Sequence, residues 1–224
     1  AGCGETPYAT VVTQLFGDRM LIANASGCSS IWGASAPSVS YAKNCEGKGP
    51  SWANSLFEDN AEYGYGMKLA SDSNKYLLEV YMKDFLDLKL DSPFNQAFTN
   101  WLDNNDDVRG SKEATAEILN LKDEVVDNEE GKDLLAKIFD LKDYLIKKSI
   151  WIFGGDGWSY DIGYGGVDHV LASGEDVNIL VFDTEVYSNT GGQSSKATPL
   201  AAVAQFAASG KKVRKKDLGL MLST

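Results

Sequence analysis

The chain has 224 residues, of which 32 are acidic and 21 are Lys or Arg, so its formal net charge is −11. Because the phosphate backbone of nucleic acids attracts clusters of Lys and Arg, this charge argues against a nucleic-acid-binding protein. Hydrophobic residues make up 43% of the chain and charged residues 24%, which is typical of a folded globular protein and excludes wholesale disorder.

The sequence also argues against a membrane or secreted protein. It has no apolar run of about 18 residues or more, and no basic segment followed by an apolar one at its start. Its three cysteines, Cys3, Cys28 and Cys45, cannot all pair with one another. We therefore expect a soluble protein with no membrane partner, in a reducing compartment such as the cytoplasm.

The first segment predicts a helix. Thr6 can act as its N-cap, Pro7 suits its first turn, and Gly17 suits its exit. The expected apolar face consists of Val11, Val12, Leu15 and Phe16.

A short buried strand and an ordered loop are expected next. Residues 20–25 (MLIANA) favour the strand, whereas residues 26–50 are rich in small residues. Because this second segment also carries Trp32 and Tyr41, which need burial, an ordered loop is favoured over a flexible linker.

The middle of the chain, residues 53–148, predicts amphipathic surface helices, two of them near 112–126 and 132–147. Apolar residues recur there at steps of three and four, with charges between them. Solvated amphipathic helices explain this whole stretch, so we assign no catalytic or binding role to it.

The last third alternates between strand and helix. Residues 149–153 (SIWIF) and 178–182 (NILVF) predict buried parallel strands, with a helix-length segment between them. An Ala-rich helix is expected at 198–209. Strand and helix in alternation favour a right-handed α/β unit, in which ligands bind beyond the carboxyl ends of the strands.

Two polar motifs occupy those strand ends. The first is Gly154-Gly155-Asp156-Gly157, whose glycines would let a phosphate approach the backbone closely. An aspartate binds phosphate best through Mg²⁺, a hard cation that prefers oxygen ligands. Taken alone, this motif favours a plain turn over a phosphate site.

The second motif, residues 183–192 (DTEVYSNTGG), directly follows the NILVF strand. It is rich in oxygen atoms and unsuited to continuing a strand. A thiamine-diphosphate site needs an Asp from one strand end, and a side-chain oxygen with a backbone carbonyl from the next. The pair of motifs is therefore much more specific than either one.

At this point the residues resemble a known family. The run GGDGWSYDIGYGGVDHVLASGEDVNILVFDTEVYSNTGGQSSKATP is similar to the thiamine-binding signature of pyruvate:ferredoxin and pyruvate:flavodoxin oxidoreductases. The segments GCGETPY, NASGCSSIWG and GPSWANSLFEDNAEYGYGM resemble upstream parts of the same C-terminal domain. The resemblance covers residues 1–67 and 149–219. It implies an α/β parallel-sheet thiamine-diphosphate-binding fold, as one domain of residues 1–224. The helical stretch at about residues 68–148 would be an insertion in that domain.

The resemblance also implies a set of site residues. Asp156 would be the Mg²⁺ carboxylate, Thr184 its hydroxyl ligand and Val186 its backbone-carbonyl ligand. Asn189 would lie near the reactive carbon of thiamine diphosphate as the catalytic residue. The further cofactor-binding residues would be Glu5, Cys28, Gly155, Gly157, Trp158, Glu185, Tyr187 and Ser188.

Cys3 and Cys28 match two of the four thiolates that hold the family's proximal 4Fe-4S cluster. The other two thiolates would lie outside this chain, so the ligand set is incomplete. The basic run 211–216 is expected to be a solvated turn.

By resemblance, the intact enzyme is a CoA-acylating pyruvate oxidoreductase. It would convert pyruvate and coenzyme A to acetyl-CoA and CO₂, and pass electrons through iron–sulfur clusters to ferredoxin or flavodoxin. Its partners would include the remaining domains of the same polypeptide and, when intact, a second copy in a homodimer. The resemblance places it in the cytoplasm, or in a hydrogenosome-like organelle if the source is an anaerobic protist. The fragment alone is expected to be inactive.

Two alternatives remain open from the sequence. One is the same domain of a pyruvate:NADP⁺ oxidoreductase, and the other is a cofactor-binding module that has no catalytic activity.

Overall fold

The computed structural model describes residues 3–223, and the chain divides into two compact units. Unit 1 comprises Ala1–Lys68 and Ser149–Thr224, whereas unit 2 comprises Leu69–Lys148. Unit 1 contains a four-stranded sheet and unit 2 is helical. The predicted α/β class, with a parallel sheet and a helical insertion, is therefore confirmed. Among the helices of residues 3–223, none is both long and apolar enough to cross a membrane.

The sheet of unit 1 is entirely parallel, in the order β2-β1-β3-β4. Because all four strands run in the same direction, their carboxyl ends lie at one edge of the sheet. Three strands were predicted at nearly these positions, but β2 was not, because its sequence SWANS shows no clear apolar pattern. The strands are β1 (Met20–Ala25), β2 (Ser51–Ser55), β3 (Ser149–Gly154) and β4 (Asn178–Val181).

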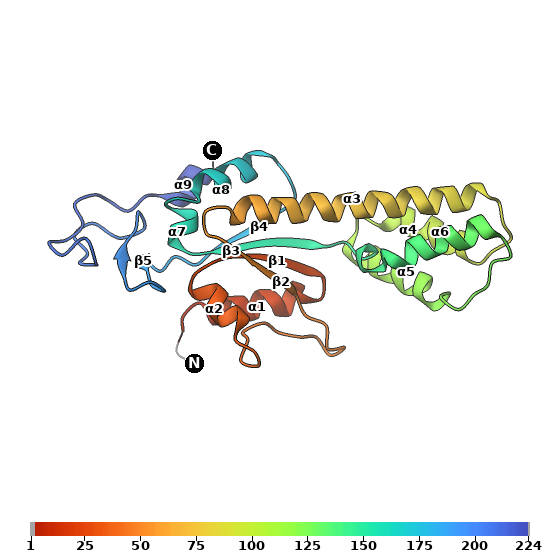
Figure 1. Ribbon diagram of the computed structural model, residues 1–224, viewed down its shortest axis with the longest axis horizontal. Coiled ribbons are helices and arrows are strands. Elements are labelled where there is room, and N and C mark those ends of the chain that lie inside the picture. Colours follow the sequence, from red (N-terminus) through yellow and green to blue (C-terminus); the bar gives the residue numbers. More distant parts are fainter. Residues whose placement is uncertain (1–2, 224) are drawn as a thin grey trace. The chain divides into compact units, whose positions relative to one another are not determined.

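One face of the sheet is covered by α1 (Thr6–Phe16) and α2 (Cys28–Ala34), which Figure 1 shows on the same side. α1 occupies the predicted segment and is followed by the short 3-10 helix η1 (Gly17–Arg19). α2 was not expected, since residues 26–50 were predicted to be a loop. The buried residues of this face are Ala9, Met20, Ile22, Phe153 and Phe182.

The predicted details of α1 need two corrections. Glu5, rather than Thr6, occupies the N-cap position. Val11 and Leu15 are 52% and 67% exposed, so they do not form the buried face. That face uses Ala9 and Thr13 instead, because the small Ala9 lets the helix approach the sheet closely.

The opposite face of the sheet is covered by α8 (Tyr164–Ala172) and by the first residues of α3 (Asn60–Asp87). The predicted packing positions Val167 and Val170 are fully buried. The short helix α7 (Asp156–Ser159) connects β3 to this layer.

Unit 2 has an apolar core of its own. Phe98 is fully buried, with its ring 5.2 Å from that of Phe85 and 5.4 Å from that of Phe94. After α3, its helices are α4 (Phe94–Asn104), α5 (Val108–Asn120), α6 (Glu129–Asp140) and the 3-10 helix η2 (Lys142–Tyr144).

The helices predicted at 112–126 and 132–147 exist, but with different bounds. α5 begins earlier because the Asp107 carboxylate caps it, accepting the Gly110 N–H at 2.6 Å. α6 begins earlier because the Asn128 side chain accepts the Gly131 N–H at 2.8 Å. Side-chain oxygens at these positions are strong N-caps.

The predicted Ala-rich helix at 198–209 is wrong. This segment forms turns and isolated bridges, and Ala201 and Phe206 have φ of 69° and 64°, outside the right-handed helical region. The elements after β4 are β5 (Val186–Tyr187) and β6 (Gln193–Ser194), which pair antiparallel, and α9 (Leu218–Leu222).

Candidate functional site

The two predicted motifs line one crevice at the carboxyl ends of β3 and β4. The glycine motif follows β3 and the oxygen-rich motif follows β4, and adjacent parallel strands bring the two together. The residues that line the crevice are Glu5, Ser26, Gly27, Cys28, Ser29, Phe57, Gly155, Asp156, Gly157, Trp158, Phe182, Thr184, Val186, Tyr187, Ser188, Asn189 and Thr190.

Asp156 is the buried charged group of this crevice. Asp156 is the first residue of α7 and is 3% exposed. One carboxylate oxygen accepts the Thr184 backbone N–H at 3.1 Å, and the other accepts the Ser195 hydroxyl at 2.9 Å. Burial raises the pKa of Asp156 to about 6, although both hydrogen bonds act in the opposite direction. A cation beside this carboxylate would favour its ionised form.

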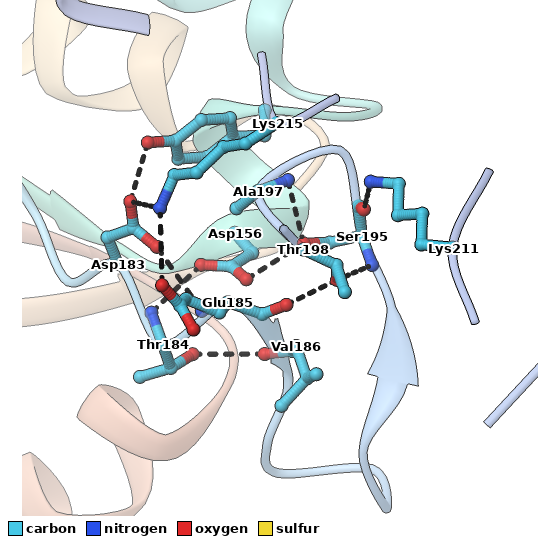
Figure 2. A network of polar contacts seen from close by, with 11 residues as sticks. Asp156, Asp183, Thr184, Glu185, Val186, Ser195, Ala197, Thr198, Lys211 and Lys215 are labelled. Carbon is cyan, nitrogen blue, oxygen red and sulfur yellow. Dashed lines mark hydrogen bonds and ion pairs between the residues drawn. The ribbon is translucent and has the colours of Figure 1, made fainter. Parts of the chain in front are cut away.

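The three predicted Mg²⁺ oxygens lie in one small region (Figure 2). Besides the contact between Asp156 and the Thr184 N–H, the Thr184 hydroxyl donates to the Val186 carbonyl at 3.0 Å. The carboxylate, the hydroxyl and the carbonyl are all hard oxygen donors, which is the donor type that Mg²⁺ prefers. The donor set therefore fits a magnesium ion.

Glu185 differs from its neighbours because its side chain does not line the crevice. The residue adopts a φ of 65°, and its carboxylate lies 3.8 Å from the Lys215 ammonium. Its backbone carbonyl accepts a hydrogen bond from the Thr198 hydroxyl. Glu185 thus holds the loop in place through its backbone.

Asp183, just before this loop, is fixed by two donors. The Tyr160 hydroxyl donates to its carboxylate at 2.7 Å, and the Lys215 ammonium lies 2.5 Å from the same oxygen. Burial opposes ionisation of Asp183, but these two contacts outweigh it and hold its pKa below the usual value. The loop after β4 is therefore tied to α7 and to the basic run at 211–216.

That run is not the solvated turn expected from the sequence. Besides the contacts of Lys215, the Lys211 ammonium donates to the Ser195 carbonyl. The Lys216 ammonium contacts the Tyr160 carbonyl at 3.3 Å and lies 3.2 Å from the centroid of the Tyr164 ring. These lysines therefore contact Ser195, Tyr160 and Asp183, which lie next to the crevice.

Gly157, Trp158 and Tyr187 shape one wall of the crevice. The Trp158 side chain is 1% exposed, and its indole N–H has no hydrogen-bond partner within the described chain. The Tyr187 hydroxyl donates to Asp161 at 2.8 Å, which fixes the ring beside Gly157. A Cβ atom at Gly157 would lie 2.6 Å from that ring, so the glycine is sterically required.

Cys28, Ser188 and Asn189 meet at the open side of the crevice. The Cys28 sulfur lies 3.2 Å from the Ser188 hydroxyl and 4.0 Å from the Asn189 side-chain oxygen. Glu5 also lines the crevice, with its carboxylate accepting the Trp32 indole N–H at 2.8 Å. The structure therefore brings the predicted N-terminal and C-terminal site residues together.

Cys3 and Cys28 line a second, adjacent cavity, which also includes Glu5 and Tyr8. Both thiols are free. Within residues 3–223, no group of three or more His, Cys, Asp or Glu side chains is placed to hold a metal ion. Two thiols match only half of the four that a 4Fe-4S cluster needs.

Several residues of the site were missed by sequence reasoning. Ser195 and Thr198 support the metal-site oxygens, Tyr160 and Lys215 hold Asp183, and Asp161 holds Tyr187. The one sequence signal that could have indicated them is the spacing of Ser195 and Thr198, three residues apart, which suits a hydrogen-bonded turn. A helix was expected from residue 198 onward instead.

Taken together, the fold and the crevice define an α/β protein that can hold a divalent cation and an anionic ligand at the carboxyl edge of its sheet. Comparison with known proteins is more specific. A pyruvate-flavodoxin oxidoreductase of Klebsiella pneumoniae is 59% identical over 221 residues, covering 99% of this chain and 19% of that protein. A pyruvate:ferredoxin oxidoreductase of Moorella thermoacetica is 60% identical over 223 residues, with coverage of 99% and 19%.

A pyruvate dehydrogenase (NADP(+)) of Cryptosporidium parvum is 49% identical over 251 residues, covering 97% of this chain and 13% of that protein. No protein-family model matches the chain. The chain spans about one fifth of the length of the first two relatives. Along nearly its whole length it is thus homologous to one segment of these pyruvate oxidoreductases, and the resemblance predicted from the sequence is confirmed.

Proposed function

We propose that this chain is the part of a CoA-acylating pyruvate:ferredoxin or pyruvate:flavodoxin oxidoreductase that binds thiamine diphosphate and Mg²⁺. The observation that carries this proposal is the convergence of the Asp156 carboxylate, the Thr184 hydroxyl and the Val186 carbonyl at one strand-end crevice. The relatives' names supply the reaction class, and the crevice supplies a place for the cofactor.

In this proposal each set of residues has a separate task. Asp156, Thr184 and Val186 would hold Mg²⁺, a cation that proteins usually share with phosphate groups, and Gly155 and Gly157 would leave room for the diphosphate. When bound, thiamine diphosphate supplies the electron sink that decarboxylation of a 2-oxoacid needs.

Asn189 and Trp158 take two further roles. Asn189, which lines the crevice, would lie near the reactive carbon of thiamine diphosphate. The Trp158 side chain excludes water from the wall of the crevice, because it is almost fully buried there.

Pyruvate and the electron acceptors are proposed from the relatives' names, whereas coenzyme A and a homodimer are proposed from the family resemblance of the sequence. Ferredoxin or flavodoxin would accept the electrons, and pyruvate and coenzyme A would be the substrates. The remaining domains of the polypeptide and a second copy in a homodimer would complete the enzyme. Cys3 and Cys28 would contribute two of four thiolates to a 4Fe-4S cluster, since both line one cavity beside the crevice.

A pyruvate:NADP⁺ oxidoreductase remains the second candidate, because the Cryptosporidium relative is 49% identical. The first candidate is favoured by the higher identities, 59% and 60%, of the flavodoxin- and ferredoxin-linked relatives.

The proposal is tested by substituting Asp156. Because Asp156 is the one carboxylate assigned to the metal, Asp156→Ala is expected to abolish Mg²⁺-dependent binding of thiamine diphosphate, measured by calorimetry on the purified chain. Asp168→Ala, an exposed carboxylate of α8, is the control and should bind like the wild type. Unchanged affinity in Asp156→Ala would contradict the assignment.

A further inference from the structure

Asp156 receives a hydrogen bond from a segment outside both motifs. Ser195 directly follows β6 and is 5% exposed, and its hydroxyl lies 2.9 Å from the Asp156 carboxylate (Figure 2). The same hydroxyl oxygen accepts the Ala197 backbone N–H at 3.0 Å. Since a serine hydroxyl has a single proton, that proton is committed to Asp156.

The Ser195 turn is itself anchored to the loop that carries the other two metal-site oxygens. The Ser195 N–H donates to the Thr198 hydroxyl oxygen at 2.9 Å, and the Thr198 hydroxyl donates to the Glu185 carbonyl. Glu185 stands between Thr184 and Val186 in the chain. The ring of contacts therefore runs from Asp156 through Ser195 and Thr198 to this loop, and returns through the Thr184 N–H.

This ring fixes the plane of the Asp156 carboxylate. One oxygen is held by Ser195 and the other by the Thr184 N–H. An ionised carboxylate has about four acceptor positions, so each oxygen keeps one position for a cation. Without the Ser195 hydroxyl, one of the two carboxylate oxygens would lose its hydrogen bond and could rotate away from its present position.

We propose that Ser195 is a positioning residue of the magnesium site, which acts by orienting the Asp156 carboxylate without touching the metal. This inference rests on the proposed function. Residues that orient metal ligands typically contribute about 10- to 100-fold to metal affinity.

A positioning role makes a specific prediction about metal preference. Mg²⁺ demands near-ideal octahedral geometry, whereas Ca²⁺ tolerates irregular coordination. Removing the Ser195 hydroxyl should therefore weaken Mg²⁺-supported binding of thiamine diphosphate by about 10- to 100-fold, and weaken Ca²⁺-supported binding much less. A general loss of folding would weaken both equally.

The experiment measures thiamine diphosphate binding to the full chain by calorimetry, with Mg²⁺ alone and with Ca²⁺ alone. Ser195→Ala should show the selective loss of Mg²⁺-supported affinity. Ser195→Thr, which keeps the hydroxyl, should restore it. Ser194→Ala removes a neighbouring hydroxyl outside the crevice and should bind like the wild type.

Three outcomes would overturn the inference. Unchanged Mg²⁺-supported affinity in Ser195→Ala would remove the positioning role and leave the proposed function intact. Equal losses with Mg²⁺ and Ca²⁺ would assign Ser195 a purely structural role. Failure of the wild-type chain to bind thiamine diphosphate with either cation would overturn the proposed function, and this inference with it.

Discussion

Asp156 illustrates how a single buried side chain signals a binding site. Its pKa of about 6 reflects a carboxylate that is removed from water, and the Ser195 and Thr184 donors compensate only in part. Buried charges in proteins are usually paired or coordinate metals. Asp156 accepts hydrogen bonds from the Thr184 N–H and the Ser195 hydroxyl, which are both neutral donors, so a bound cation would complete its environment.

Two glycines of the first motif have different steric surroundings, which permits a matched test. A Cβ atom at Gly157 would lie 2.6 Å from the Tyr187 ring, whereas one at Gly155 would lie 3.6 Å from the Phe182 carbonyl oxygen, an ordinary van der Waals contact. Gly157→Ala is therefore expected to destabilise the chain by about 1–3 kcal/mol, because Tyr187 is held by Asp161 and cannot move freely. Urea denaturation measures this change.

Gly155→Ala serves as the comparison. Its methyl group fits the folded chain, so its stability should match that of the wild type. It would instead occupy space in the crevice where the diphosphate is proposed to lie, and should weaken cofactor binding in calorimetry. Equal stability of the two variants would contradict the crowding at Gly157.

At the scale of elements, the strands of unit 1 were predictable because burial on both faces produces continuous apolar runs. SIWIF and NILVF became β3 and β4 within one residue at their ends. The motifs that follow them were predictable for the same reason, since neighbouring parallel strands end at one edge. The position of Asp156 beside the Thr184 loop was thus accessible from the sequence.

The segment at 198–209 was not predictable by the same reasoning. Its alanines favour a helix, but propensity is a weak prior that tertiary contacts override. The Ala201 N–H donates to the Lys211 carbonyl, and the Lys211 N–H donates to the Ala202 carbonyl, so the chain folds back on itself. Leu200, Val203 and Phe206 are exposed, so their apolar side chains did not indicate a buried helix face.

Ser195 was missed for a related reason. Its contact with Asp156 joins residues 39 positions apart and depends on a turn that only the folded segment creates. No local pattern specifies such a contact. The convergence of Asp156, Thr184 and Val186 in one crevice was therefore predictable, but the contact from Ser195 was not.

The helical unit provides a test of packing at the scale of elements. Phe98 is fully buried between Phe85 and Phe94. Phe98→Ala is expected to cost about 3–5 kcal/mol, because it removes buried apolar surface and leaves a cavity. Leu119→Ala, at a position that is 38% exposed, should cost much less. Comparable losses in urea denaturation would contradict the proposed aromatic core.

At the scale of the whole molecule, two properties decide what the chain can do alone: the share of its relatives that it matches and the charge of its crevice. It matches about one fifth of each pyruvate:flavodoxin or pyruvate:ferredoxin relative. In residues 3–223, the charged side chains that line the crevice are Glu5 and Asp156, both acidic. Glu5 is engaged by the Trp32 indole and Asp156 is assigned to the metal.

This arrangement predicts cofactor binding without turnover. Pyruvate is an anion, and the two acidic side chains do not attract it, so we expect its binding groups to come from the remaining domains. Members of the family that the sequence resembles activate the cofactor with a glutamate from a different domain, so we expect this group too to be missing here. General acid–base assistance is typically worth about 10²–10⁴-fold in rate. The two reductions in rate should multiply, because the missing pyruvate-binding groups affect substrate positioning and the missing glutamate affects proton transfer.

The expected outcome is no detectable pyruvate-dependent reduction of a dye acceptor by the chain alone, with Mg²⁺, thiamine diphosphate and coenzyme A supplied. The same assay on an intact relative, such as the Klebsiella enzyme, is the positive control. Calorimetry on the same preparation separates the two steps, because the chain should still bind thiamine diphosphate. Turnover by the chain at a rate near that of the intact enzyme would mean that the groups for pyruvate and for proton transfer lie within these 224 residues.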